Sequence, residues 1–176
     1  MTAPAVHTAA PFSIRPYVAA DLDGVVTVFL SAVRETASRD YSGAQVDAWA
    51  QVDRELWAVR RRSRPTWVAL VGESLAGFAD LEGSGHLDMM YVHPAHQRRG
   101  VASALLECAE ASARARGISR IFTEASITAR PFFTRRGFRT VAPNTVDVRG
   151  VRMSNFRMEK LLAPVPAGQR PSARRT

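Results

Sequence analysis

The stretch 90–104, with the sequence MYVHPAHQRRGVASA, combines the features of an anion-binding site. An apolar segment leads through a proline turn into a basic loop with Gly100, and a helical pattern follows. The N–H groups from Arg99 to Ser103 would converge at the positive end of this helix, and glycine would let the backbone approach a ligand closely. Arg98 and Arg99 add charge. The stretch therefore predicts a phosphate or pyrophosphate site, and an ordinary basic loop is the simpler alternative.

Two other candidates for chemistry carry less information. His93 and His96 have a spacing that could hold a metal, but they flank Pro94 with no third ligand in view, so we interpret them as surface histidines and expect no metal site. Cys108 is the one cysteine of the chain and cannot form an internal disulfide. A single cysteine is consistent with a reducing compartment, and Cys108 is interpreted as a small side chain packed in a helix.

The elements that must position these residues follow from the spacing of apolar side chains. Apolar residues three and four apart predict four helices. The first begins near Asp21, the second begins near Ser42, and the third and fourth cover 99–116 and 128–136. Continuous or alternating apolar runs predict seven strands, over 12–17, 66–71, 75–82, 86–93, 118–124, 138–148 and 151–160. The strand–helix–strand order from 86 to 124 implies a parallel crossover, so a mixed α/β sheet is expected.

Length, hydropathy and charge limit the number of domains and the classes of partner. The 176 residues suit one domain, expected over 12–161, with a flexible N-terminus over 1–11 and a disordered basic tail over 162–176. No run of about 18 apolar residues occurs, so no membrane partner and a cytoplasmic location are expected. The net charge of +8 suits an anionic partner. The arginine cluster at 60–64 is interpreted as the solvated end of the second helix.

The motif Gln97–Arg98–Arg99–Gly100–Val101–Ala102 resembles the signature of the GNAT superfamily of N-acetyltransferases, which is Gln or Arg, two residues, Gly, one residue, Gly or Ala. The stretch 131–138, PFFTRRGF, is similar to the family's short helix ending in Gly-Phe. The resemblance extends over 12–160 and points to an uncharacterised bacterial subgroup. It implies a mixed, mostly antiparallel twisted sheet of about seven strands flanked by about four helices.

The resemblance also implies a cofactor, an activity and a set of residues that bind the cofactor. The chain would move an acetyl group from acetyl-CoA to a primary amine of a small molecule or peptide, by direct transfer within a ternary complex. The pyrophosphate would lie on backbone N–H groups at 98–103, and the backbone of Met90 and Val92 would pair with the pantetheine arm. The implied cofactor-binding residues are Met90, Tyr91, Val92, Gln97, Arg98, Arg99, Gly100, Val101, Ala102, Ser103, Phe132 and Phe133.

The catalytic base would come from three candidates. Strand alternation puts His86 and Asp88 on one face, and family members often use a carboxylate near this place. Asp88 ranks first and Glu124 second, while His86 competes because its ordinary pKa lies close to neutral. Glu124 could instead bind the cation of the substrate. The alternative is that Asp88 and His86 pair with each other or with arginines.

The acid is where the chain departs from the family pattern. A tyrosine usually stands four residues before the glycine of the Gly-Phe pair, but this chain has Phe133 there. Tyr41, Tyr91 or water would then protonate the thiolate, or solvent would do so after release. Tyr41 and Trp49 are also expected to wall the acceptor pocket, since the first two helices border that pocket in the family.

Two other functions compete with the transferase. A non-catalytic acyl-CoA sensor is consistent with Phe133, and a nucleic-acid-binding module is suggested by the charge and the arginine cluster but has no recognised motif. The acceptor cannot be identified from the sequence, and either a monomer or a homodimer is compatible with it.

Overall fold

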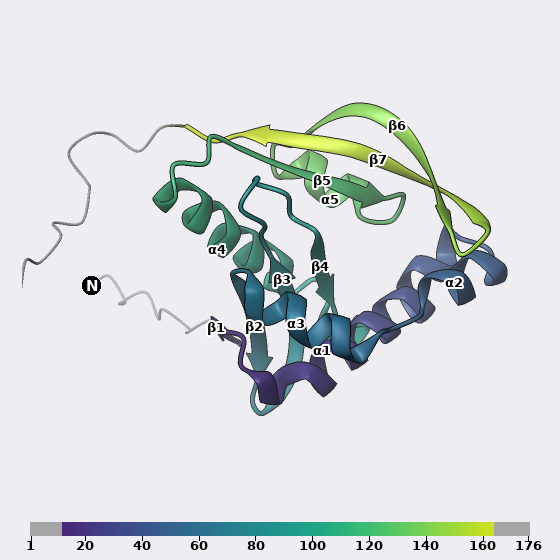
Figure 1. Ribbon diagram of the computed structural model, residues 1–176, viewed down its shortest axis with the longest axis horizontal. Coiled ribbons are helices and arrows are strands. Elements are labelled where there is room, and N and C mark those ends of the chain that lie inside the picture. The colour runs from purple at the N-terminus through teal and green to yellow at the C-terminus, as the bar shows by residue number, and fades with distance from the viewer. Residues whose placement is uncertain (1–11, 164–176) are drawn as a thin grey trace, which may run out of the picture.

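The computed structural model describes residues 12–163, whose strands form two sheets that diverge from one another (Figure 1). The first sheet is antiparallel with the order β1-β2-β3-β4, and the second is antiparallel with the order β5-β7-β6. The strands are β1 (Ser13–Pro16), β2 (Thr66–Val71), β3 (Ser74–Asp80), β4 (Met89–Val92), β5 (Arg120–Ser126), β6 (Arg139–Val148) and β7 (Val151–Leu161).

The two sheets meet at a single parallel bridge between His86 and Phe122. The N–H of Leu87 donates to the carbonyl of Phe122 at 2.9 Å, and the N–H of Phe122 donates to the carbonyl of Gly85 at 3.0 Å. The predicted parallel crossover is therefore present but brief. The strand expected over 86–93 is shorter than predicted, because residues 86–88 form the bridge and β4 begins at Met89. Beyond the bridge, β4 and β5 separate and leave a gap between the sheets.

Five α-helices and four short helical turns connect these strands. The helix expected from Ser42 is in fact two helices, because Asp53 begins a new one by accepting a hydrogen bond from the N–H of Leu56. The helices are α1 (Leu22–Ser31), α2 (Gly43–Trp49), α3 (Arg54–Ser63), α4 (Val101–Ala115) and α5 (Arg130–Arg135). The turns are η1 (Ala19–Asp21), η2 (Ala32–Thr36), η3 (Ala37–Arg39) and η4 (Pro94–His96).

Two apolar cores lie on opposite faces of the first sheet. Helix α4 covers one face, and α1 and α3 cover the other, where Phe78 of β3 packs against Trp57 with tilted rings. Helix α5 packs against β5 and β6 of the second sheet. Gly77 of β3 lies where α4 approaches closely, because a Cβ there would be 2.9 Å from the carbonyl oxygen of Tyr91 and 3.0 Å from Val101. The absence of a side chain at Gly77 thus lets the start of α4 lie against β3 and β4.

The expected end of the domain at 161 falls inside the packed structure. Leu162 is buried, and its N–H donates to the carbonyl of Ser119 at 2.8 Å. The expected flexible N-terminus at 1–11 and the tail from 164 onward lie outside the described residues.

The arginine cluster at 60–64 is not the solvated exit that the sequence predicted. Arg61 is 2% exposed, and its Nη1 lies 2.8 Å from Oδ2 of the buried Asp80. Trp57 lies one helical turn before Arg61, and the guanidinium carbon is 4.7 Å from the centre of its indole ring. The prediction was wrong because α3 packs this face onto the sheet, where the end of β3 supplies a carboxylate. Burial raises the pKa of Asp80 to about 6, against the opposing effect of Arg61.

We expect Arg61→Met to lower the free energy of unfolding by about 3–5 kcal/mol at neutral pH, because it leaves the Asp80 carboxylate buried without its partner. The loss should be smaller at pH 5, since a raised pKa lets Asp80 take up a proton and become neutral there. Arg62→Met, at the exposed next position, should change stability by less than about 0.5 kcal/mol. Denaturant unfolding measures both, and equal losses would contradict the buried pair.

Candidate active site

The start of α4 presents backbone N–H groups that have no acceptor within the helix. The first helical bond runs from the N–H of Ala104 to the carbonyl of Gly100 at 3.0 Å, and no side chain caps this end. Gly100 has a φ of +85° and Arg98 a φ of +62°, so the loop turns through two left-handed residues. Such a turn points successive N–H groups the same way and favours an anion. The geometry fits the predicted pyrophosphate site.

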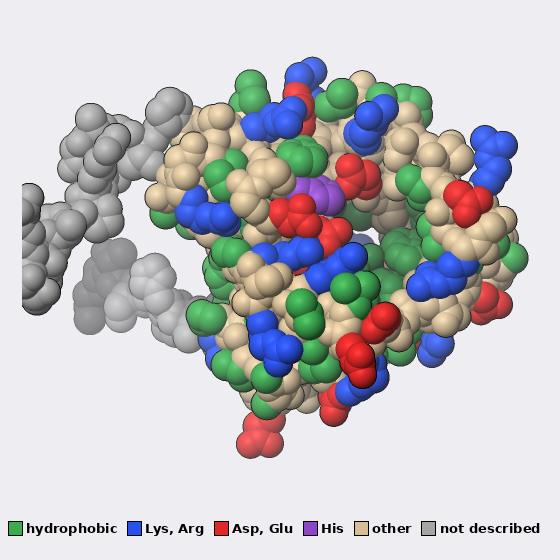
Figure 2. Space-filling view, viewed as in Figure 1, with side chains coloured by type: hydrophobic (Ala, Val, Ile, Leu, Met, Phe, Trp, Pro, Cys, Tyr) green, Lys and Arg blue, Asp and Glu red, His purple; other side chains and the backbone are tan. Residues whose placement is uncertain are grey.

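A cavity of about 580 Å³ begins at this loop and continues between β4 and β5. Its volume lies within the range of small-molecule sites. At one end it is lined by the loop and the start of α4, and at the other by the carboxylates of Asp88 and Glu124. Figure 2 shows the hollow in this face, with acidic and hydrophobic side chains beside it. Among the predicted site residues, the lining includes Tyr41, Trp49, Asp88, Met90, Tyr91, Val92, Gln97, Arg98, Gly100, Val101, Ala102, Ser103, Glu124, Phe132 and Phe133.

Strand β4 turns one backbone edge toward the gap between the sheets. Its other edge pairs with β3, where the N–H of His93 donates to the carbonyl of Ala76 at 2.8 Å. Because backbone direction alternates along a strand, the N–H and carbonyl groups of Met90 and Val92 point away from β3. These groups are suited to pair with an extended ligand, as the resemblance to the GNAT family implied for the pantetheine arm.

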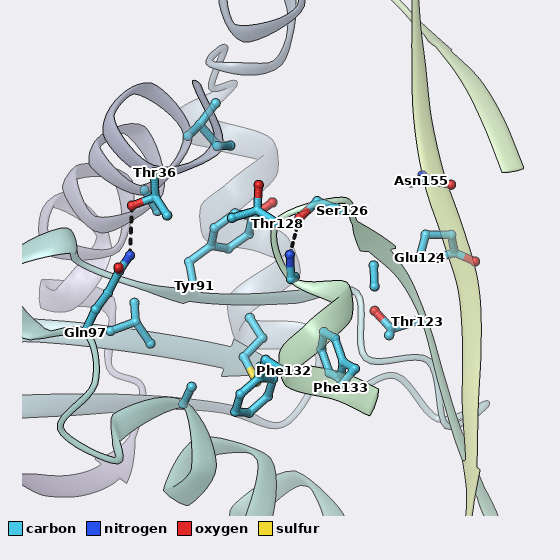
Figure 3. Close-up of a pocket in the computed structure, with 18 of the residues that line it drawn as sticks. Thr36, Tyr91, Gln97, Thr123, Glu124, Ser126, Thr128, Phe132, Phe133 and Asn155 are labelled. Carbon is cyan, nitrogen blue, oxygen red and sulfur yellow. Dashed lines mark hydrogen bonds between the residues drawn. The ribbon is translucent and has the colours of Figure 1, made fainter. Parts of the chain in front are cut away.

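Gln97 has a structural contact that the sequence did not indicate. Its Nε2 donates to Oγ1 of Thr36 at 2.8 Å, across the gap between the anion-binding loop and η2 (Figure 3). Thr36 itself also lines the cavity. The side chain of Gln97 thus positions the loop, and no spacing in the sequence links the two residues.

Asp88 and Glu124 have different partners. Asp88 Oδ2 is 2.8 Å from Nη1 of Arg64, which also lies 2.8 Å from Oε1 of Glu82. Glu124 Oε2 is 2.6 Å from Nε2 of His86, and Nδ1 of the same ring is 3.4 Å from Glu82. The sequence had left open that Asp88 and His86 pair with each other or with arginines. Asp88 pairs with an arginine, and His86 pairs with glutamates.

Arg64 and Glu82 contact the candidate base residues Asp88 and His86, and sequence reasoning missed both contacts. Glu82 stands four residues before His86, and Arg64 belongs to the cluster that was interpreted as solvated. The tertiary structure brings the two beside the cavity, because α3 ends next to the end of β3. His86 does not line the cavity itself, and its ring stacks on Phe122 with centroids 5.0 Å apart.

The hydroxyl of Tyr41 is occupied by backbone partners. It donates to the carbonyl of Ser154 at 2.7 Å and accepts from the N–H of Ile127 at 2.9 Å. The single proton of this hydroxyl is therefore committed to a carbonyl, which counts against Tyr41 as the acid that protonates a thiolate. Burial raises the pKa of Tyr41. Its ring still lines the cavity, with Trp49 at 5.4 Å between centroids.

Tyr91 and Phe133 complete the survey of possible acids. The ring of Tyr91 packs against Phe29 at 5.0 Å, and burial raises the pKa of its phenol strongly. Phe133 is 3% exposed and packs between Phe132 and Phe138, at centroid distances of 5.3 and 5.0 Å. Figure 3 shows Phe132 and Phe133 together on α5, which follows a turn where the N–H of Ala129 donates to Ser126.

The histidines near the loop have local partners. Nδ1 of His93 accepts from the N–H of Ala95 at 3.2 Å, and the rings of His93 and His96 are 5.8 Å apart. Burial lowers the pKa of His96. Within residues 12–163, no group of three or more His, Cys, Asp or Glu side chains is arranged to hold a metal ion, and none of the helices is long and apolar enough to span a membrane.

A family model described as acetyltransferase (GNAT) domain matches residues 37–160. The chain belongs to the GNAT family. A curated relative, the uncharacterised N-acetyltransferase YafP of Escherichia coli K12, is 40% identical over 145 residues, which are 82% of this chain and 93% of YafP.

Solved structures agree with this family. A GCN5-related N-acetyltransferase from Rhodopseudomonas palustris has a TM-score of 0.83 and 34% identity, over 85% of this chain and 95% of that one. PaiA N-acetyltransferase from Thermoplasma acidophilum, solved with coenzyme A, has a TM-score of 0.71 and 22% identity over 86% and 99%. YncA from Salmonella typhimurium, solved with acetyl-CoA, has a TM-score of 0.66 and 20% identity, over 89% of this chain and 96% of that one.

These findings confirm the predicted fold class and general activity. The seven strands and five helices form the mixed α/β fold of GNAT proteins. The chain is an acetyl-CoA-dependent N-acetyltransferase, as its family and its curated relative show.

We expect acetyl-CoA to raise the melting temperature of the native chain, because a ligand bound only by the folded state stabilises it by mass action. Gly100→Glu should remove this shift, since the side chain strains a left-handed position and its charge opposes the phosphates. Gly117→Glu is the matched control, with a φ of +71° just beyond the other end of α4. Isothermal titration measures both variants, and an unchanged acetyl-CoA affinity in Gly100→Glu would refute the placement of the site.

Proposed function

We propose that the chain transfers an acetyl group directly from acetyl-CoA to a primary amine of a small molecule or peptide, with both molecules bound at once. One observation carries this proposal. A single cavity has the anion-binding start of α4 at one end and two carboxylates at the other. The donor and an ammonium group can therefore meet in one space, without a covalent intermediate on the protein.

Glu124 is the base in this proposal, and His86 receives the proton from it. An ammonium must lose a proton before its nitrogen can attack a thioester. The 2.6 Å contact between Glu124 and His86 gives that proton a path, and the side chain of His86 is 20% exposed. The charge of Asp88 is instead balanced by Arg64. The order suggested by the sequence, Asp88 before Glu124, stays a prediction, and these contacts support the reverse.

Acetyl-CoA supplies an activated acetyl group and a thiolate leaving group when it is bound. The N–H groups of Met90 and Val92 are placed to orient the donor and to stabilise charge on the carbonyl oxygen. The thiolate takes its proton from water in this proposal. Tyr41 has its proton committed to Ser154, and Phe133 has none to give.

The two competing functions find less support in the described residues. The nucleic-acid module depended on exposed arginines at 60–64, but Arg61 is buried and Arg64 joins three carboxylates. The acyl-CoA sensor is opposed by the kinship with N-acetyltransferases. Release of free thiol in the presence of an amine tests the transferase against the sensor.

We expect Glu124→Gln to lower turnover about 100-fold or more at neutral pH, because a general base contributes roughly 10²–10⁴ to the rate. Asp88→Asn should lower it less, since its carboxylate is held by Arg64. Acetyl-CoA affinity, measured by titration, should be nearly unchanged in both. If Asp88→Asn loses turnover and Glu124→Gln keeps it, the base is Asp88.

We expect Phe133→Tyr to keep or raise the rate of acetyl transfer, with a new ionisation on the alkaline side of the pH profile. The change adds a hydroxyl to a ring that lines the cavity, where related enzymes carry their acid. Phe138→Tyr is the control, because this equally buried ring packs on Phe133 but does not line the cavity. A hydroxyl buried without a partner costs about 1–3 kcal/mol of stability.

Single-turnover transfer across pH is the measurement for Phe133→Tyr, because product release can hide a change in chemistry. A folded Phe133→Tyr protein that binds acetyl-CoA and shows the native rate and pH profile would mean that residue 133 takes no part in proton transfer.

A further inference from the structure

The cavity is closed on one side by hydrogen bonds that join distant parts of the chain. Helix α2 lies beside the tip of the β6–β7 hairpin (Figure 1). The bonds across this seam run from Gln45 Nε2 to the carbonyl of Arg152 (2.9 Å), from Arg149 Nη1 to the carbonyl of Ala48 (2.8 Å) and from the Tyr41 hydroxyl to the carbonyl of Ser154 (2.7 Å). These bonds join α2 and the turn before it to the hairpin along this side of the cavity.

A second seam closes the neighbouring side. Oγ1 of Thr128 donates to Oδ2 of Asp40 at 2.6 Å, and the N–H of Ile127 donates to the Tyr41 hydroxyl at 2.9 Å. The turn before α2 is thus tied both to β7 and to the loop before α5. Glu124 is 37% exposed and Asp88 25% exposed, so the acceptor end opens to solvent on the carboxylate side.

The wall behind these carboxylates is apolar and rich in aromatic rings. Trp49 packs edge-on against Tyr41 at 5.4 Å and lies 6.5 Å from Tyr91 between ring centroids. Aliphatic side chains from η2, β6 and β7 continue this lining, and they are Val33, Val146, Val148 and Met153. Such a surface favours a ligand that buries apolar area and penalises one whose hydroxyl groups would lose water there.

Charge separates the two ends of the cavity. Its arginines are Arg98 in the loop and Arg135 at the end of α5, and α5 lies beside the start of α4 because Arg136 contacts Ser103. Both positive charges therefore face the donor end. At the acceptor end, the charged side chains that line the cavity are the carboxylates of Asp88 and Glu124. Arg64 balances the charge of Asp88 from outside the lining, so Glu124 carries the negative charge that faces a ligand. A cationic group is favoured there.

We propose that the acceptor is a small primary amine carried on an apolar body about the size of one aromatic ring, and that Trp49 determines this preference. The inference rests on the proposed function and narrows its acceptor. The ammonium lies at Glu124, and the apolar body lies against Trp49 and its neighbours Tyr41 and Tyr91. A peptide would have to enter from the open carboxylate side, where the apolar wall penalises its amide groups because they would lose water.

The test compares four amines in a free-thiol assay: phenethylamine, ethanolamine, glucosamine and a tripeptide with a free N-terminus. We expect kcat/KM for phenethylamine to exceed that for each other amine by about tenfold or more. Trp49→Ala should remove this advantage, measured as the ratio of kcat/KM for phenethylamine to kcat/KM for ethanolamine, while leaving the affinity for acetyl-CoA within about twofold. Trp49→Phe should restore most of it. Turnover of the tripeptide equal to that of phenethylamine, or a Trp49→Ala protein that keeps the preference, would overturn the inference.

Titration of phenethylamine into the protein loaded with coenzyme A separates this inference from the proposed function. Binding that is weakened about tenfold by Trp49→Ala, together with no thiol release for any amine, would refute the transfer and leave the ligand class supported. Absence of phenethylamine binding, with thiol release from ethanolamine or glucosamine, would refute the ligand class and leave the transfer supported.

Discussion

The separation of β4 from β5 is the constraint on which the site depends. Two neighbouring strands that kept their pairing would satisfy each other's backbone groups and leave no room for a ligand. Here the pairing stops after the bridge between His86 and Phe122. The free edge of β4 then faces a cavity, and the divergence of the two sheets gives that cavity its volume. The donor site, the carboxylates and the apolar wall all border this one gap.

Helix α4 is held against the first sheet by close packing, and this packing places its N–H groups at the mouth of the gap. Gly77 permits α4 to approach β3 closely, and Leu105 and Leu106 of α4 are buried in the apolar core. The left-handed turn at Gly100 then begins the helix without a side-chain cap, so its dipole acts on a ligand. The close packing at Gly77 is a steric effect, whereas the uncapped start of α4 acts electrostatically.

A network of charged side chains connects the buried face of the first sheet with the carboxylates at one end of the cavity. It runs from the buried pair of Arg61 and Asp80 through Arg64 to Asp88 and Glu82, and from Glu82 through His86 to Glu124. An arrangement of this kind holds the carboxylates in place and gives protons a route to solvent. It also explains why α3 matters for a site to which it contributes no lining residue.

The local elements and the candidate anion-binding loop could be predicted from the sequence alone. Turn glycines and apolar spacing predicted both hairpins and α4, and Gln97–Ala102 predicted the anion-binding loop, because these features depend on contacts between near neighbours in the chain. The partners of the charged groups, in contrast, depend on how distant segments pack together. The hydrogen-bonded partners Arg64 and Asp88 are 24 positions apart in the sequence, His86 and Glu124 are 38 apart, and Tyr41 and Ser154 are 113 apart. Long-range pairing leaves no periodic pattern, so the burial of Arg61 and the closed wall of the acceptor pocket follow from how the two sheets and α2 pack together.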